Sequence, residues 1–515
     1  MSCMFCRSQA WDQRIEFPKF RGLTGPSENG RKTLTGPFRE PPLREPAPFP
    51  QDWYSGSPET GHFFPPCKIP AVQSSDVSPG APARDDGVVF QVGDHALDNG
   101  LRILTLEDHS APVVSFQIHY AVGSRNERPG ITGISHLFEH MMFKGTERRG
   151  PEMIAREIQA QGGTLNAFTT TDNTSYFENL PADRLELAMD IESDRMLRLR
   201  IDEANLRTER EVVRNERKVS LVNTPTGLAE ELLLSLLFDA HPYRWPVVGW
   251  DADLRAITLQ NCLDYFAVHY APNRATIVLV GDFQTEAARE MACRYFGPAE
   301  RRPDPPPIVT TERPQRGEKR AIYKKVVQAP GFVAGFHAPA WKDPDWPAVE
   351  LIETALTAGR SSRLYRRFVK PGRVASISVT GGIYFGTTDP SLVEVAATAP
   401  PGGDIAGVEA EVWEEISQIA SDGLTGEELA KVRKQREAFF YLQAQSCFSK
   451  GVQLGLRQIR QGDWRGMNGQ VALWQSVTNA DIRRVASALF RPDNRAVVTI
   501  QPVTPAEWSD LGTVE

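Results

Sequence analysis

The stretch His136-Leu137-Phe138-Glu139-His140 constrains this chain more than any other feature of the sequence. The two histidines are four positions apart, so on an α-helix their side chains lie on one face, one turn apart. Both imidazoles can then reach one metal ion, with Glu139 projecting beside them. Two nitrogen ligands and a carboxylate that takes a proton from metal-bound water are what a zinc hydrolase requires. The order H-x-x-E-H is the reverse of the commoner H-E-x-x-H zinc helix.

The neighbours of this motif favour a metal site over the alternative, a surface helix whose two histidines and glutamate are merely solvated. Apolar residues lie within the motif and on both sides of it, and they predict a buried or half-buried helix. They are Ile134, Leu137, Phe138, Met141, Met142 and Phe143. Unpaired polar groups are costly in such surroundings, so three of them require a partner, and a metal ion supplies one.

A third zinc ligand must come from elsewhere, because a catalytic zinc takes three protein ligands and keeps one position for water. Residues 201–222 are predicted to form a long helix that opens with the acidic residues Asp202 and Glu203, which are favourable at a helix N-terminus. Glu209 and Glu216 are seven positions apart, or two turns, and therefore share a face of that helix. On spacing alone both could equally be solvated, as most helical glutamates are.

Together, the histidine motif and the segment from Glu209 to Glu216 resemble the insulinase/pitrilysin family of zinc peptidases, the inverzincins, which includes mitochondrial processing peptidase. Glu216 stands 76 positions after His140, in the place where the family has its third ligand. The resemblance implies that His136, His140 and Glu216 bind Zn²⁺. It implies that Glu139 is the catalytic base, and that Glu209 is a second catalytic glutamate that supports the site without binding the metal.

The segment 162–181 resembles the strand that follows the zinc helix in this family, whose edge pairs with an extended substrate. The resemblance implies that Asn166, Ala167 and Phe168 bind a peptide. Taken alone, Asn166 could equally be a turn residue. Residues 175–180 form a short β-prone run that ends at a proline.

Composition places limits on the class of protein. A chain of 515 residues is too long for one core, and 41% apolar with 24% charged residues is typical of a soluble globular protein. A net charge of −7 and a pI near 5.9 argue against nucleic acid as a partner. The six cysteines have no disulfide-framework spacing, and no apolar run approaches the roughly 18 residues that span a membrane. No secretory signal is visible, which predicts the cytoplasm, with the periplasm as the alternative.

Residues 1–86 carry 14 of the 39 prolines and are predicted to be an irregular N-terminal extension. Alternating apolar patterns begin at residue 88, and Asn99-Gly100 is a hairpin signal between the first two strands. The expected strands are 88–92, 101–106, 113–122 and 275–280, with further strands near 166–180. The expected helices after the histidine motif are 152–161, 182–199 and 202–222.

The second half of the chain repeats the first. The tripeptide Asn-Arg-Ala begins at residues 273 and 494, a period of 221. We therefore expect an α+β fold of two homologous α/β-sandwich domains that face each other like the shells of a clam. The predicted boundaries are 87–301 for a catalytic zinc-binding domain, 302–317 for a Pro-rich linker and 318–510 for a homologous non-catalytic domain. In the second copy, the zinc helix corresponds to residues 350–354, which contain no histidine, and the copy of Glu216 falls near Phe439.

Active single-chain members of the family carry an Arg and a Tyr in the second half that hold substrate at the zinc. Aligned on Ser362-Arg363-Leu364, these positions are Val369 and Ser376, so the pair is absent. The resemblance then implies a bacterial type with divided labour, in which this chain bears zinc. Its partner would be a homologous zinc-less subunit. The alternative is a homodimer, in which a second copy of this chain is the partner. If the alignment is shifted, the alternative residues are Arg366, Arg367 or Arg373 with Tyr365 or Tyr384.

The leading hypothesis is a zinc-dependent metalloendopeptidase that hydrolyses peptides or unfolded segments held extended in a closed chamber. One alternative is a non-catalytic structural or assembly subunit of the same fold, although such a subunit has no need of three ligands and a base. Another is a zinc hydrolase of small amides or esters, against which the predicted peptide-binding strand argues.

Overall fold

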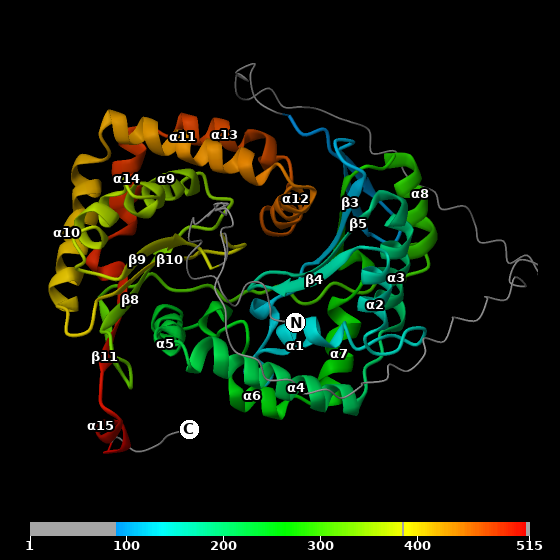
Figure 1. The fold of residues 1–515 in the computed structure, drawn as a ribbon, viewed down its shortest axis with the longest axis horizontal. Coiled ribbons are helices and arrows are strands. Elements are labelled where there is room, and N and C mark those ends of the chain that lie inside the picture. The colour runs from blue at the N-terminus through cyan, green and yellow to red at the C-terminus, as the bar shows by residue number, and fades with distance from the viewer. Residues whose placement is uncertain (1–88, 384–385, 511–515) are drawn as a thin grey trace, which may run out of the picture. The chain divides into compact units, whose positions relative to one another are not determined.

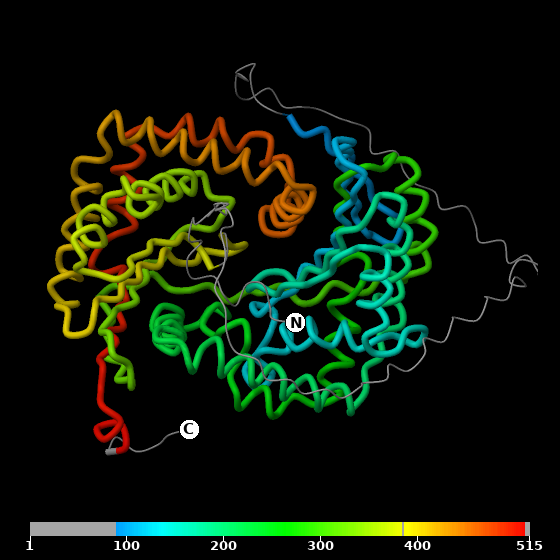
Figure 2. Tube along the Cα trace, viewed as in Figure 1, coloured from blue at the N-terminus to red at the C-terminus, as the bar shows by residue number. Residues whose placement is uncertain are grey.

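The computed structural model describes residues 89–383 and 386–510. These residues form two mixed β-sheets with their helices, so the fold is α+β with a duplicated plan, as the sequence predicted. Figure 1 labels the elements and Figure 2 follows the same chain as a tube. The Pro-rich segment 1–86, predicted to be irregular, lies outside the described residues.

The first sheet has six strands in the order β1-β2-β6-β3-β5-β4. Strands β2 and β6 run parallel, and every other neighbouring pair is antiparallel. Strand β4 comes last in the order, so one of its edges pairs with β5 and the other carries no strand of the described chain. The bounds are β1 Gly93–Ala96, β2 Arg102–Glu107, β3 Val113–Tyr120, β4 Thr164–Thr169, β5 Thr174–Pro181 and β6 Ala275–Gly281.

The second sheet, of five strands, repeats this pattern in the order β7-β11-β8-β10-β9. Here β7 and β11 are the parallel pair, and the other neighbours are antiparallel. Strand for strand, β7, β11, β8, β10 and β9 therefore occupy the places of β2, β6, β3, β5 and β4. The bounds are β7 Lys319–Lys325, β8 Gly331–Ala338, β9 Ser376–Gly381, β10 Ser391–Thr398 and β11 Arg495–Pro502. The two Asn-Arg-Ala tripeptides lead into β6 and β11, which are equivalent strands.

The first predicted strand is wrong in its position. Residues 89–92 form no strand, and residue 88 lies outside the described chain. The backbone of Phe90 is instead bound by the side chain of Asn468, which accepts from its N–H at 2.9 Å and donates to its carbonyl at 3.1 Å. The hairpin at Asn99-Gly100 is present but joins β1 to β2, and Gly100 has the positive φ of +88° that such a turn requires.

In the first half, helices are present close to the ranges predicted at 152–161, 182–199 and 202–222, and further helices that were not predicted follow them. The bounds are α1 Ile134–Met141, α2 Met153–Ala160, α3 Leu185–Arg198, α4 Glu203–Arg217, α5 Gly227–Leu237, α6 Asp251–Ala256, α7 Leu259–His269 and α8 Thr285–Phe296. Helix α4 starts where its acidic residues predicted, because the Asp202 side chain accepts a hydrogen bond from the N–H of Asn205 at 2.9 Å. It continues into a π-helix, η4 Lys218–Val222, which the sequence did not reveal.

The second half carries α9 Trp346–Thr357, α10 Ile405–Asp422, α11 Gly426–Gln443, α12 Cys447–Gln461, α13 Gly466–Ser476, α14 Asn479–Leu489 and α15 Pro505–Asp510. A π-helix, η7 Tyr365–Val369, follows α9. Among the described helices, none combines the length and the apolar character that crossing a bilayer requires.

One helix of each half packs on the sheet of the other half. Helix α5 packs on β8 and β11 of the second sheet, whereas α12 packs on β3 and β6 of the first (Figure 1). Close approach of α12 depends on glycines: a Cβ on Gly455 would lie 2.2 Å from Nε2 of His119. Both faces of the first sheet are consequently buried. In β6, Ile277 and Leu279 face the helices of the first half, and Val278 and Val280 belong to the core shared with the second half.

His119 is buried beneath α12, and its ionisation is linked to stability. Its ring bonds the Ser175 hydroxyl at 2.7 Å and the Gln117 amide oxygen at 3.1 Å. Burial, together with the charge of Arg460, lowers the pKa of His119 to about 3, against about 6.5 in an unfolded chain. Because the unfolded state binds the proton more tightly, this contribution to stability is complete above about pH 6.5 and is lost as the pH falls toward 3.

We expect lowering the pH from 7 to 5 to cost the wild-type protein about 2 kcal/mol at this one residue. His119→Gln keeps the hydrogen-bonding groups but has no proton to gain. Urea unfolding of both proteins at both pH values measures the effect: the difference in unfolding free energy between them should shrink by about that amount at pH 5. Equal losses in the two proteins would show that His119 does not titrate as a buried group.

Candidate active site

The histidine-bearing helix α1 begins at a position that only glycine fits. Gly133 has a φ of +88°, and a Cβ there would lie 2.5 Å from the carbonyl oxygen of Val248. The carboxylate of Glu127 accepts hydrogen bonds of 2.8 Å from the N–H groups of Gly133 and Ser135. These are amides that a helix start leaves unpaired, so Glu127 fixes the beginning of α1.

Helices α1 and α4 pack together and bring the three predicted ligands into one cluster. The ligand atoms of His136, His140 and Glu216 all lie within 4.8 Å of one another. Oε2 of Glu216 is 3.7 Å from Nε2 of His136 and 3.3 Å from Nε2 of His140. Ligands about 2.0–2.1 Å from a tetrahedral zinc lie about 3.4 Å apart, so this donor set fits zinc. Within residues 89–383 and 386–510, no other group of His, Cys, Asp or Glu is arranged in this way.

Carboxylates make the surroundings of the cluster attractive to a cation. Oε2 of Glu209 lies 3.5 Å from Nδ1 of His140, and its Oε1 lies 2.7 Å from Nζ of Lys144. Burial alone would lower the pKa of His140, but its hydrogen bonds with Glu209 and Glu216 and the charge of Glu139 raise it to about 10. Because Nδ1 faces Glu209, the Nε2 atom of His140 is the one that can face a metal.

Glu139 lies next to the cluster without belonging to it. Its Oε2 atom is 4.0 Å from Nε2 of His136 and accepts a hydrogen bond of 2.7 Å from Oγ1 of Thr169. The carboxylate is therefore held from β4 while it remains beside the ligands. Thr169 was not predicted as a site residue. The available signal was its spacing, since it stands two positions after Ala167 and shares its side of the strand.

The three predicted peptide-binding residues lie on β4, the outermost strand of the first sheet, which contacts α1. Ala167 and Phe168 are buried, and Asn166 is half-buried. The N–H of Ala167 donates to the Asn166 side-chain oxygen at 3.0 Å rather than to a neighbouring strand. The structure thus brings Asn166, Ala167 and Phe168 to an edge strand, where pairing with an extended chain is geometrically possible.

Two family models match the chain in succession. "Insulinase (Peptidase family M16)" matches residues 102–249, and "Peptidase M16 inactive domain" matches residues 256–436. Together they cover most of the two sheets and their helices. The chain belongs to the insulinase family of peptidases. The first model contains the histidine motif and Glu216, whereas the second contains α9 and most of α11.

Relatives and solved structures agree with this assignment. "Zinc protease PqqE" of Helicobacter pylori is 25% identical over 410 residues, which is 79% of this chain and 92% of the relative. "Probable mitochondrial-processing peptidase subunit beta, mitochondrial" of Arabidopsis thaliana is 27% identical over half of each chain. "The crystal structure of a protease from Helicobacter pylori" superimposes with a TM-score of 0.77 and 24% identity, and covers 81% of this chain and 100% of that one. The names of the relatives support a protease function.

In the second half of this insulinase-family chain, an ion pair occupies the place of the histidine cluster. The predicted copy of the zinc helix, residues 350–354, lies in α9, which packs on α11 as α1 packs on α4. Nη2 of Arg436 on α11 lies 3.0 Å from Oε2 of Glu353, and Glu350 accepts from the indole N–H of Trp474 at 2.7 Å. Phe439, expected near the copy of Glu216, is largely exposed. Metal-binding side chains are thus gathered in one half only of the described chain.

The expected substrate-holding pair of the family is absent at the aligned positions. Val369 ends the π-helix η7, and Ser376 is the first residue of β9. Among the alternative residues, Arg367 and Arg373 form ion pairs with Glu411 on α10, at 3.1 and 2.7 Å. They are thereby committed to the helical layer of the second half. Tyr384, another alternative, lies outside the described residues.

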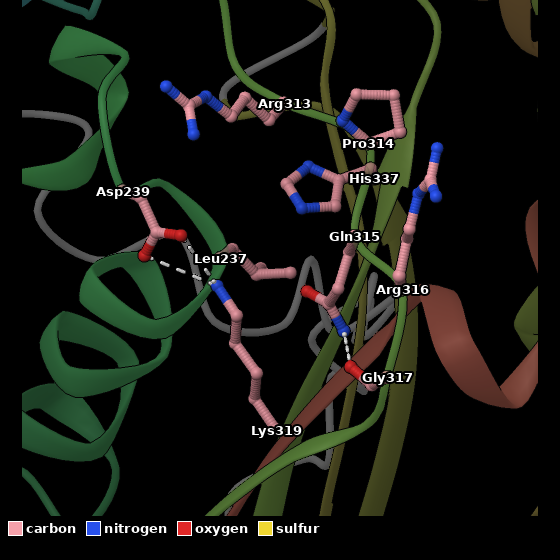
Figure 3. Close-up of a pocket in the computed structure, with 9 residues that line it drawn as sticks. All are labelled: Leu237, Asp239, Arg313, Pro314, Gln315, Arg316, Gly317, Lys319 and His337. Carbon is pink, nitrogen blue, oxygen red and sulfur yellow. Dashed lines mark hydrogen bonds and ion pairs between the residues drawn. The ribbon is translucent and has the colours of Figure 1, made fainter.

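A cavity of about 500 Å³ lies apart from the histidine cluster, between residues 313–317 and the second sheet (Figure 3). One of its walls is the ion pair of Lys319 and Asp239, in which Nζ of Lys319 also caps the carbonyl of Leu236 at 2.6 Å. The lining residues are Leu237, Asp239, Arg313, Pro314, Gln315, Arg316, Gly317, Lys319 and His337. None of them is a predicted ligand or base, so this cavity is not the candidate active site.

Proposed function

We propose that the chain is a zinc-dependent metalloendopeptidase. The observation that carries this proposal is the convergence of His136, His140 and Glu216 on one point, with the carboxylate of Glu139 beside them. A structural subunit has no need of this set, because three ligands and an adjacent base serve hydrolysis rather than packing. The names of the relatives support the same class of reaction.

Each residue of the site would have its own role in the reaction. His136, His140 and Glu216 would hold the metal, and Glu209 would keep the His140 ring in the orientation that presents Nε2. When bound, zinc supplies Lewis-acid chemistry: it acidifies a water molecule and polarises the scissile carbonyl. Glu139 would take the proton of that water at its carboxylate and deliver it to the leaving amine.

We propose that the substrate is a peptide or an unfolded segment held in extended form. The support is β4, whose outer edge carries Asn166, Ala167 and Phe168 and whose last residue, Thr169, bonds Glu139. Pairing along this edge would recognise the backbone of the substrate, and it would place a peptide bond near the base. A small amide or ester would have no use for such an edge.

We further propose that a second chain completes the site. An insulinase-family chain with Val369 and Ser376 at the expected Arg and Tyr positions lacks the guanidinium and the phenol that would hold the scissile carbonyl. A zinc-less homologue that carries both residues would supply them from its second half, and a homodimer is the fallback. Of the chain's own arginines near Val369, Arg367 and Arg373 are engaged by Glu411, whereas Arg366 is exposed.

The proposed function is tested by digestion of a library of unstructured peptides, read by mass spectrometry. The zinc-loaded chain is assayed alone and after mixing with candidate zinc-less homologues. We expect little cleavage by the chain alone, and cleavage at internal peptide bonds once the partner is present. Full activity from a strictly monomeric preparation would contradict the divided site, and no cleavage in any combination would contradict the peptidase.

A further inference from the structure

A fully buried arginine joins the two halves next to the candidate active site. Arg460 lies at the C-terminal end of α12, the helix that the second half lends to the first sheet (Figure 1). Its side chain is fully buried. Burying a guanidinium is costly unless its donors are satisfied, so what it binds indicates why it is there.

Several partners of Arg460 lie in the short turn that joins β4 to β5. Nη2 donates to Oγ1 of Thr170 at 2.9 Å and to Oδ1 of Asn173 at 3.0 Å. Nη1 donates to the carbonyl of Gly386 at 2.6 Å, and Nε lies 4.0 Å from the carboxylate of Asp172. Arg460 thus ties one turn of the first half to its own half through a planar set of donors that a lysine could not reproduce.

The same turn is held from its other side by residues of the first half. The Tyr243 hydroxyl donates to Oδ1 of Asp172 at 2.7 Å, and Nε of Arg125 lies 3.6 Å from the same oxygen. The N–H of Arg125 also donates to the carbonyl of Thr171 at 2.9 Å. The turn is therefore clamped between fixed groups, so its position depends on all of them, including Arg460.

This turn begins directly after the residue that bonds the candidate base. Thr169 ends β4, and its Oγ1 donates to Oε2 of Glu139 at 2.7 Å. Thr170, the next residue, accepts a hydrogen bond from Arg460. A displacement of the turn would move Thr169 with it, and with Thr169 the hydrogen bond that orients Glu139. A shift of about 1 Å at a reacting group is enough to reduce a rate by orders of magnitude.

We propose that Arg460 is a positioning residue: from the second half, it sets the place of Glu139 through the β4–β5 turn and the hydroxyl of Thr169. This inference rests on the proposed peptidase function. The second half is then more than a wall of the substrate site, because it contributes a buried cation on which the alignment of the base depends. The alternative is a purely structural role, in which Arg460 only stabilises the contact between the halves.

A second buried arginine provides a matched control that tests the structural alternative. Arg457 lies one turn earlier on α12 and is also buried, but its contacts remain in the second half. Its guanidinium donates to Gln453 at 3.2 Å and Gln470 at 3.1 Å, and stacks over Trp341. Arg457→Met should therefore cost stability, as Arg460→Met does, without reaching the turn or Glu139.

The kinetic test combines Arg460→Met, Thr169→Val and the double variant, all loaded with zinc and assembled with the partner that the wild type requires. Each single variant should lower kcat by roughly 10- to 100-fold, with KM and zinc content near those of the wild type. Because both act on the same bond, the double variant should be no slower than the slower single variant. Thr169→Ser should restore the rate, and Arg457→Met should leave kcat unchanged. If Arg460→Met does not fold, Arg460→Lys takes its place, with a smaller loss and the same non-additivity.

A second measurement needs neither zinc nor activity. Amide hydrogen exchange of the zinc-free proteins should be faster in residues 169–175 of Arg460→Met than in the wild type, and unchanged there in Arg457→Met. Equal kcat losses in the two arginine variants, or losses that multiply in the double variant, would overturn the proposal. If the wild type cleaves no peptide, the proposed function fails by itself. Hydrogen exchange in the turn then decides whether Arg460 holds the turn in place, and an exchange rate unchanged in Arg460→Met would reject that role.

Discussion

Glu139→Gln is expected to remove nearly all peptide hydrolysis while the protein keeps its zinc. Glutamine has the shape of glutamate, and its side-chain oxygen can still accept the hydrogen bond from Thr169. It cannot take a proton from water or pass one to the leaving amine. General acid–base groups contribute roughly 100- to 10,000-fold to a rate, so kcat should fall by about that factor. Glu139 is not among the three clustered ligands, so metal content should stay at the wild-type level.

The measurement is kcat on one fluorogenic peptide chosen from the library digest, with zinc measured on the same samples. Glu211→Gln is a suitable control, because Glu211 lies on α4, is exposed and pairs only with Arg214 among the described residues. It should cleave as the wild type does. Near wild-type hydrolysis by Glu139→Gln would show that another group is the base.

His140→Ala is expected to lose zinc altogether. This change removes one of the two nitrogen donors and also the ring that Glu209 holds in place. Two protein ligands do not make a stable zinc site, and the carboxylates left behind repel one another where the metal stood. Metal analysis after gel filtration should give about one zinc per wild-type chain and none for the variant.

Glu209→Gln is expected to weaken zinc binding without abolishing it, and so provides a comparison for His140→Ala. Its amide oxygen can still accept from Nδ1 of His140, but it has lost the charge that pairs with Lys144. Loss of such supporting groups typically weakens metal binding by about 10- to 100-fold. The variant should therefore bind zinc when zinc is supplied in excess and lose it on dialysis. If His140→Ala held zinc as tightly as Glu209→Gln, His140 would not be a ligand.

Local pattern was enough to predict the duplicated plan and the facing histidines, whereas the choice of Glu216 as third ligand came from the family resemblance. Helical spacing placed His136 and His140 on one face, and the repeat of Asn-Arg-Ala marked two equivalent strands, β6 and β11. The strand expected at residues 88–92 failed because Asn468 binds the backbone of Phe90. That competition comes from a residue 378 positions away, and no local pattern contains it.

The same reason explains why the groups around the base were missed. Thr169 looks like any β-branched residue in a strand, and Arg460 like any basic residue on a helix. The role of Arg460 arises only when α12 packs on the first sheet, which brings Arg460 to Thr170 across 290 positions of sequence. The exchange of α5 and α12 between the halves has no sequence signature of its own.

The most direct test of the proposed zinc site is anomalous diffraction from crystals of the zinc-reconstituted protein, recorded on both sides of the zinc absorption edge. We predict one strong peak, about 2.0–2.2 Å from Nε2 of His136, Nε2 of His140 and a carboxylate oxygen of Glu216, with Glu139 beside it but not bound. A folded protein supplied with zinc that shows no peak at this cluster, or a peak bound by other residues, would contradict the proposed site.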